Sequence, residues 1–117
     1  MAGSVLIVDD NPRFRDRARR WLEASGFAVV AEAADGRSAL EAIRDHRPAV
    51  VLLDVELPDM SGIAVANRVT GEPDSPAVVL TSTHDAADYG DRAVRCGARG
   101  FVPKAELSGE AIADLLR

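Results

Sequence analysis

A run of five apolar residues, Ala49 to Leu53, leads directly into Asp54, and this stretch constrains the fold more than any other part of the sequence. A strand that is apolar along its whole length is buried on both faces, which is typical of the parallel sheets of α/β proteins. In open sheets of this kind, ligands bind outside the carboxyl ends of the strands. Asp54 stands at such an end, although an aspartate that merely begins a turn would fit this stretch alone equally well.

Four more stretches share the features of strands, and helical patterns separate them. Strands are expected at residues 4–8, 27–34, 77–80 and 100–102, in addition to 49–53, and the more alternating pattern of 27–34 places it nearer an edge. Helices are expected from Pro12 to Gly26, between the turn Asp35-Gly36 and Pro48, at 63–70, at about 85–96, and after the cap Ser108. This alternation predicts a doubly wound α/β fold with one parallel sheet, helices on both faces and right-handed crossovers.

The first predicted helix has the clearest local signals. Asn11 is expected to cap its N-terminus, and Pro12 is expected at its first position, where the missing N–H costs nothing. The apolar stripe expected to face the sheet consists of Phe14, Ala18, Trp21 and Leu22. On the opposite, arginine-rich face, Asp16 is spaced to pair with Arg19 or Arg20.

The composition excludes several classes of function. The 117 residues are 47% apolar and 28% charged, with no linker or repeat, so we expect one domain over residues 1–117 with no output domain. The formal net charge of −5 argues against nucleic-acid binding by this domain. The single cysteine, the absence of an apolar run of roughly 20 residues and the absence of a secretory signal predict a cytoplasmic location without membrane association.

Polar residues follow four of the predicted strands. Asp9 and Asp10 follow the first strand, Asp54 the third, Thr81 the fourth and Lys104 the fifth. Because the carboxyl ends of parallel strands meet at one edge, three carboxylates would repel one another there unless a cation joined them. Hard oxygen ligands of this kind suit Mg²⁺. The hydroxyl and the ammonium add the donor and the charge that a phosphoryl group requires, so phosphate chemistry is favoured over a simple cation site.

Other common chemistries find no support in the sequence. It contains neither the glycine-rich phosphate loop of nucleotide-binding proteins nor a GxGxxG motif after the first strand. It also has no serine at a nucleophile elbow and no cluster of histidine and cysteine ligands.

The chain resembles the receiver domains of two-component response regulators over its whole length. The motifs that carry the resemblance are Asp9-Asp10, Asp54 followed by Pro58 and Gly62, Thr81 after a buried strand, and Phe101 three residues before Lys104. The resemblance implies a flavodoxin-like (βα)5 fold with five parallel strands in the order 2-1-3-4-5. The turn Asp35-Gly36 and the ending Phe101 to Lys104 are most similar to receivers linked to helix-turn-helix DNA-binding domains.

The resemblance also implies a Mg²⁺-dependent transfer of a phosphoryl group from a sensor histidine kinase to Asp54. Asp10 would bind Mg²⁺ directly and Asp9 largely through water. Asp54 and the backbone carbonyl of Glu56 would complete the protein ligands of the metal.

Five side chains receive further roles through the resemblance. Thr81 and Lys104 would bind phosphoryl oxygens, and Phe101 would turn inward together with Thr81 as a switch. Glu56 and Thr83 would tune the lifetime of the phosphoryl group. The switch would change the partner affinity of a surface formed by the fourth helix, the fifth strand and the last helix, and a homodimer would form through this surface or through the first and last helices.

The implied function is a phosphorylation-controlled switch in a phosphorelay, which would regulate transcription through an attached output domain. It would not be an enzyme, apart from its own phosphorylation from small donors and its own dephosphorylation. One alternative is a Mg²⁺-dependent phosphatase with an aspartyl nucleophile, because Asp54-Val55-Glu56 is distantly similar to the DxD start of those enzymes, although they carry it on the first strand. The other is a degenerate receiver that binds partners without phosphorylation, against which the intact set of polar residues argues.

Three departures from the family pattern have consequences. Ala105 follows the lysine where members usually have proline, and Pro103 precedes it, so a trans Lys104–Ala105 bond is expected. The segment 62–76 is short, so the helix after Gly62 is expected to be clipped. Ser82 stands where alanine is more typical, which we expect to be a minor change.

Overall fold

The computed structural model describes residues 3–83 and 86–117, and within them the chain forms one parallel sheet. Its strands are β1 (Gly3–Val8), β2 (Phe27–Ala33), β3 (Val50–Asp54), β4 (Ala77–Ser82) and β5 (Gly100–Pro103). Their order, β2-β1-β3-β4-β5, confirms the predicted topology.

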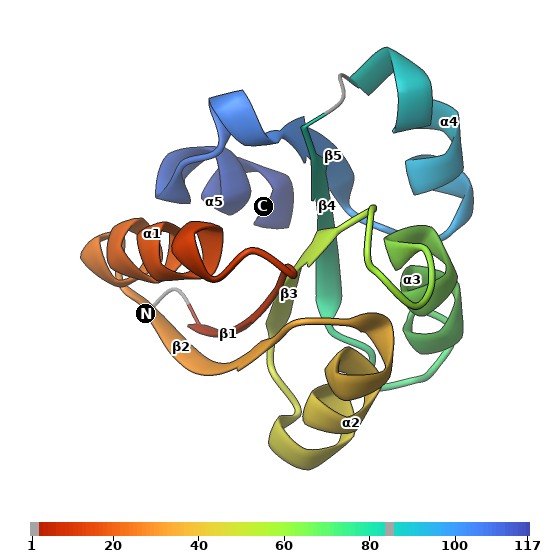
Figure 1. The fold of residues 1–117 in the computed structure, drawn as a ribbon, viewed down its shortest axis with the longest axis horizontal. Helices are drawn as coiled ribbons and strands as arrows, with labels where there is room; N and C mark the ends of the chain where they lie inside the picture. Colours follow the sequence, from red (N-terminus) through yellow and green to blue (C-terminus); the bar gives the residue numbers. More distant parts are fainter. Residues whose placement is uncertain (1–2, 84–85) are drawn as a thin grey trace.

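Helices cover both faces of the sheet (Figure 1). One face carries α1 (Pro12–Ala24) and α5 (Gly109–Leu116), and the other carries α2 (Gly36–His46), α3 (Gly62–Val69) and α4 (Ala86–Arg95). A short 3₁₀ helix, η1 (Lys104–Glu106), connects β5 to α5 and was not predicted. α3 has eight residues, as expected for a clipped helix. The expected start of the fourth helix, Asp85, lies outside the described residues.

The central strands are buried as their apolar sequences predicted. All five residues of β3 are buried, and Val5 to Val8 of β1 are exposed by 1% or less. β2, by contrast, alternates between buried and more exposed residues and lies at the edge of the sheet, which confirms the interpretation of its alternating pattern.

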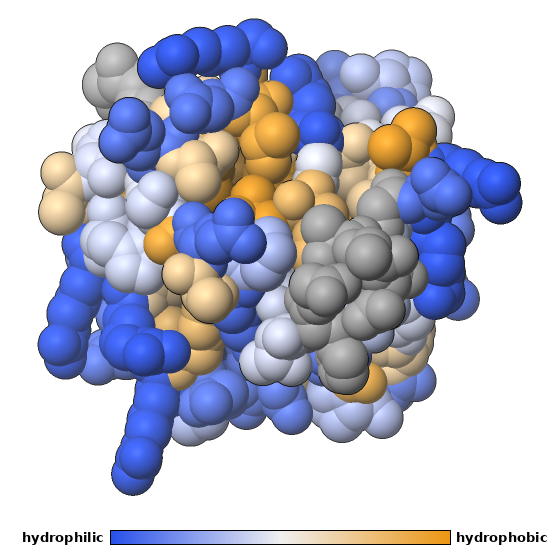
Figure 2. Space-filling model, turned by 90° about the horizontal axis from the view of Figure 1, so that it is seen from above, coloured by the Kyte–Doolittle hydropathy of each residue, from blue (hydrophilic) through white to orange (hydrophobic). Residues whose placement is uncertain are grey.

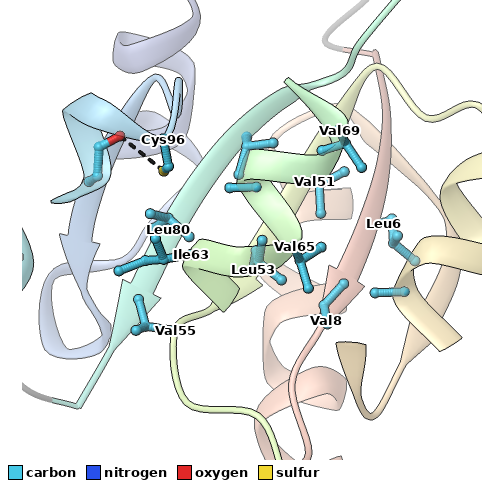
Figure 3. Close-up of a cluster of buried hydrophobic side chains, with 14 of the residues drawn as sticks. Leu6, Val8, Val51, Leu53, Val55, Ile63, Val65, Val69, Leu80 and Cys96 are labelled. Atoms are coloured by element: carbon cyan, nitrogen blue, oxygen red, sulfur yellow. Dashed lines mark hydrogen bonds between the residues drawn. The ribbon is translucent and has the colours of Figure 1, made fainter. Parts of the chain in front are cut away.

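The larger apolar cluster lies between the sheet and the helices α2, α3 and α4. Leu53 and Leu80 enter it from β3 and β4, and Val65 enters it from α3 (Figure 3). Cys96 closes the cluster just beyond the end of α4, where its thiol donates to the carbonyl of Ala93 at 3.2 Å. The buried cysteine is therefore a packing residue, as predicted.

The smaller cluster lies between the sheet and the helices α1 and α5. Phe14, Ala18 and Leu22 of α1 are buried in it, together with Ile112 of α5. Trp21 was expected in this core, but its side chain is only partly buried. It lines a hollow beside Lys104, because the large indole ring lies at the side of the apolar stripe and does not face the sheet directly.

The helix caps follow the sequence at two ends and differ from expectation at a third. Asn11 and Ser108 cap α1 and α5 as predicted, each through a side-chain oxygen that accepts an N–H of the first turn. Asp35 and Gly36 were expected to form a turn, and this was wrong. Asp35 is the N-cap of α2, its carboxylate accepts the N–H of Ser38 at 2.8 Å, and Gly36 is the first helical residue.

Apolar side chains also reach the surface. On the face shown in Figure 2, hydrophilic side chains surround apolar patches near the middle of the view. Val94 of α4 is 77% exposed and Val30 of β2 is 40% exposed. None of the helices in the described residues has both the length and the apolar character needed to cross a bilayer.

We expect Gly62→Ala to destabilise the fold at the loop that follows β3. Gly62 is buried, its N–H donates to the carbonyl of Val55 at 2.7 Å, and a Cβ there would collide with the backbone oxygen of Asp54. Forcing the backbone apart costs about 1–3 kcal/mol, which urea denaturation would measure. Gly71→Ala is the matched control, because a Cβ at Gly71 meets nothing within 4 Å. Equal stability of the two variants would contradict the close packing of this loop.

Candidate functional site

The strand register brings the predicted site residues to one edge of the sheet. Asp54 ends β3 and is paired directly with Thr81 of β4. Val8 and Leu53 are partners in β1 and β3, so Asp9 follows its strand beside Asp54. Sequence reasoning expected this edge because every candidate follows the carboxyl end of a strand.

Three carboxylates form a cluster at this edge. One oxygen each of Asp9, Asp10 and Asp54 lies within 4.8 Å of the others. Asp9 is fully buried and Asp54 is 4% exposed, whereas Asp10 is exposed. The N–H of Asn11 donates to Asp9 Oδ1 at 2.8 Å, and the N–H of Glu56 donates to Asp54 Oδ1 at 2.9 Å. These backbone donors orient the two buried carboxylates so that their Oδ2 atoms lie near the same cation.

That cation is the ammonium of Lys104. Its Nζ lies 2.7 Å from Asp9 Oδ2 and 3.1 Å from Asp54 Oδ2. The Phe14 ring covers the ammonium from the α1 side, with its centroid 4.4 Å from Nζ. The positive charge of Lys104 thus contacts two carboxylates and one aromatic face. Partial removal of water from the ammonium strengthens each of these interactions.

Burial and charge shift the pKa values of this pair. Burial raises the pKa of Asp54 from 3.8 to about 6, and the charge of Asp9 adds to the rise. The N–H of Glu56 and the ammonium of Lys104 act in the opposite direction. Burial alone would lower the pKa of Lys104, but its contacts with Asp9 and Asp54 outweigh that effect and raise it.

The donor set fits a hard divalent cation. Asp9 Oδ2 is buried, and its polar neighbour in the described part of the chain is the Lys104 ammonium, without hydrogen-bond geometry between them. This buried carboxylate oxygen therefore has an ion-pair partner but no well-aligned hydrogen-bond donor. Together with the exposed carboxylate of Asp10, it offers the oxygen ligands that Mg²⁺ prefers.

The predicted switch residues lie next to the cluster. The Thr81 hydroxyl is buried and donates to the carbonyl of Val102 at 2.7 Å, so it is directed towards β5. Phe101 is partly buried, and its ring centroid lies 5.7 Å from that of Tyr89 on α4. Thr83 is exposed just after the end of β4.

A contact between Glu56 and Ser82 was missed by the sequence analysis. Ser82 is fully buried at the end of β4, and its hydroxyl donates to Glu56 Oε1 at 2.9 Å. The serine was expected to be a minor change from alanine. It fixes the side chain of Glu56 beside Asp54, so that expectation understated its role.

A second missed residue, Asp59, holds the loop after β3 against α2. Its two carboxylate oxygens accept the N–H groups of Gly36 and Arg37 at 2.8 and 2.9 Å. These bonds lower the pKa of Asp59. The helix N-terminus favours the negative charge as well. No local sequence signal identifies these two hydrogen bonds, because Asp59 is more than twenty residues from Gly36 and Arg37 in the chain.

Two hollows differ in their relation to the site. A hollow of about 420 Å³ lies between α2 and α3, where Arg44, Arg68 and Glu72 line it, away from the carboxylates. A smaller one of about 230 Å³ lies beside Lys104. The larger of these two hollows therefore does not coincide with the carboxylate cluster, and the polar residues mark the candidate site.

Comparison with known proteins decides the family. The family model of the response regulator receiver domain matches residues 5–116. This chain belongs to the response regulator receiver domain family. The signal receiver domain of the response regulator NarL from Mycobacterium tuberculosis has a similar structure, with a TM-score of 0.85 and 40% identity over 96% of this chain and 94% of that one.

Relatives of this receiver domain are parts of different whole proteins. It is 40% identical over 113 residues to the transcriptional regulatory protein NarL of Mycobacterium tuberculosis, which covers 96% of this chain and 52% of the relative. It is 38% identical over 110 residues to a protein-glutamate methylesterase/protein-glutamine glutaminase of Alkalilimnicola ehrlichii, covering 91% of this chain and 28% of the relative. The chain thus spans about a quarter to about half of these relatives.

We expect Asp54→Asn to stabilise the metal-free receiver domain at neutral pH. The folded pKa of about 6 lies above the usual 3.8, so ionised Asp54 destabilises the fold above pH 6. That destabilisation is lost as the pH falls from the folded towards the unfolded pKa. The gain should be on the order of 1–3 kcal/mol at neutral pH and should vanish near pH 4.

Thermal denaturation in EDTA across this pH range is the measurement. Asp16→Asn is the control, because Asp16 is exposed and paired with Arg20 on the surface of α1, and it should change stability little. A stability gain for Asp54→Asn that persisted at low pH would contradict the raised pKa.

Proposed function

We propose that this receiver domain accepts a phosphoryl group on Asp54 from a sensor histidine kinase, with Mg²⁺ held by Asp9, Asp10, Asp54 and the backbone carbonyl of Glu56. The observation that carries the proposal is the partly buried Lys104 ammonium, which lies between the carboxylates of Asp9 and Asp54, next to a buried Asp9 oxygen that lacks a hydrogen-bond donor. A simple cation site has no need of such an ammonium, whereas a phosphoryl group does.

The chemistry requires an ionised Asp54 and a fixed positive charge. With a pKa of about 6, the carboxylate is mostly ionised at neutral pH. One of its oxygens forms the new bond to phosphorus, while the phosphorus–nitrogen bond of the kinase phosphohistidine breaks and its electron pair remains on the ring nitrogen. Bound Mg²⁺ would neutralise charge on the transferred phosphoryl oxygens. Lys104 stays protonated, turns from the carboxylate to a phosphoryl oxygen and pairs with it.

Thr81 and Phe101 then convert the new charge into a change of surface. The Thr81 hydroxyl would leave the Val102 carbonyl for a phosphoryl oxygen, and Phe101 would turn inward from its place beside Tyr89. The affected surface consists of α4, β5 and α5. We propose that it changes affinity for a partner or for a second copy, with α1 and α5 as the alternative dimer surface.

The wider role follows from the relatives. We propose that residues 1–117 form a single receiver unit that controls transcription in the cytoplasm through an attached output domain, as the name of the NarL relative suggests. In this role the domain catalyses its own phosphorylation from small donors and its own slow dephosphorylation, and it acts on no other substrate.

Phosphorylation of Asp54 should be visible as a mass increase. Incubation with Mg²⁺ and acetyl phosphate should give one phosphoryl adduct on the parent, detected by intact mass. Asp54→Asn should give none, and the parent should give little when EDTA replaces Mg²⁺. Asp16→Asn serves as a control carboxylate on α1 and should be modified like the parent. An adduct on both the parent and Asp54→Asn, or on neither, would refute the assignment of Asp54 as the phosphoacceptor.

We expect Glu56→Ala and Thr83→Ala to shorten the lifetime of the phosphoryl group several-fold. Glu56 is held beside Asp54 by Ser82, and removing its side chain opens the approach of water to the acceptor. Thr83 lies exposed just after β4 and would shield the same approach. Loss of the phosphorylated mass with time, after removal of the donor, is the measurement. Glu72→Ala, in the exposed loop after α3, is the control, and rates equal to the parent in both site variants would refute the role.

A further inference from the structure

A guanidinium from α1 holds the turn that carries two of the acidic residues. Arg15 Nη1 donates to the backbone carbonyl of Asp9 at 2.7 Å. Its Nε donates to Glu32 Oε1 on β2 at 3.0 Å. The other oxygen of Glu32 accepts from Arg19 Nε at 2.9 Å. One carboxylate on the edge strand thus fixes the side chain that reaches the site.

This arrangement differs from the other arginine pairs on α1. The Arg15 and Glu32 side chains are 19% and 28% exposed. The Arg20 side chain is 76% exposed, and its partner Asp16 lies on the same helix. Exposed pairs within one helix contribute little. The Arg15 side chain instead connects α1 with two strands. Its partner Glu32 lies on β2, opposite Ile7 of β1, and the Asp9 carbonyl that accepts its other hydrogen bond follows β1 directly.

The carbonyl that Arg15 holds belongs to the peptide group between Asp9 and Asp10. A peptide group is planar, so fixing its oxygen fixes the plane that joins the Cα atoms of these two residues. The N–H of Asp9 is held separately by the carbonyl of Ala33 at 3.0 Å. Arg15 therefore restrains the peptide group that joins the Cα atoms of Asp9 and Asp10, from which the two carboxylates project.

We propose that Arg15, held by Glu32, is a positioning residue for the divalent cation: it preorganises the carboxylates of Asp9 and Asp10 through the peptide group between them. This inference rests on the proposed Mg²⁺ site and assigns its preorganisation to a side chain that carries none of the ligands. Loss of such a support weakens metal binding on the order of tenfold or more.

A simple charge effect would have the opposite sign. If Arg15 acted only as a nearby positive charge, its removal would strengthen Mg²⁺ binding, because like charges repel. A tether predicts weaker binding on removal. The direction of the change in the dissociation constant therefore separates the two explanations.

Titration of the full chain with MgCl₂ by isothermal titration calorimetry tests the proposal. Arg15→Met keeps the length of the side chain but removes its donors and should raise the Mg²⁺ dissociation constant on the order of tenfold. Arg15→Lys keeps the charge but replaces the two separate donor nitrogens of the planar guanidinium with one ammonium nitrogen, which cannot reproduce the geometry of both bonds, and it should also raise the constant. Arg20→Met, the control from the same helix, should leave it within about twofold.

Outcomes other than these would overturn the proposal. Unchanged or tighter binding in both Arg15 variants would show that the tether does not position the ligands, as would an equal loss in Arg20→Met. If Arg15→Met does not fold by circular dichroism, Arg15→Lys decides alone. A parent that fails to bind Mg²⁺ would refute the proposed metal site itself. The mass assay then shows whether phosphorylation of Asp54 fails with it, so the two failures are distinguishable.

Discussion

The ion pairs of Lys104 with Asp9 and Asp54 are the contacts on which the rest of the site depends. Two carboxylates buried to this extent would otherwise repel each other and push the strand ends apart. The ammonium compensates one of them, and Asp10 adds a further negative charge at the rim. The edge therefore keeps a net negative charge that a divalent cation would neutralise. The same negative charge would favour a bound divalent cation and would destabilise this edge in the absence of one.

The strand order makes the Lys104–Asp54 ion pair possible because one strand, β4, lies between β3, which ends in Asp54, and β5, which Lys104 follows. Lys104 follows β5, while Asp54 ends β3, so the side chain crosses the end of β4, over a span of roughly 10 Å at the usual strand spacing. Thr81 ends up beneath this path, directly opposite Asp54. A group that bonded to Asp54 would therefore meet the ammonium and the hydroxyl at once. The long lysine side chain spans this distance, and the short threonine leaves room for it at the end of β4.

The sequence was sufficient for the framework but not for the supports of the site. Apolar runs and the polar residues that end them located the strands and the cluster around Asp54, because strand ends follow a fixed rule in parallel sheets. The order of the strands came from the resemblance to receiver domains. The bond from Arg15 to the Asp9 carbonyl and the bonds from Asp59 to α2 escaped prediction, because each joins elements distant in the chain through one rotamer. The cap at Asp35 was mistaken for a turn, since the same residue types favour both.

The Thr81 hydroxyl gives the proposed switch its bias. It is fully buried and bonded to the Val102 carbonyl, so leaving that carbonyl without a new acceptor would cost about 1–3 kcal/mol. A phosphoryl oxygen on Asp54 would supply that acceptor and, being charged, would bind the hydroxyl more strongly than a carbonyl does. In the proposed switch, the hydroxyl would therefore stay bonded to the Val102 carbonyl while Asp54 is a plain carboxylate and would leave it when Asp54 is phosphorylated. Val102 follows Phe101 directly in β5, so the Thr81 acceptor and the Phe101 ring belong to the same short strand. One exchange of hydrogen bonds at Thr81 would therefore couple the proposed site to the surface of β5.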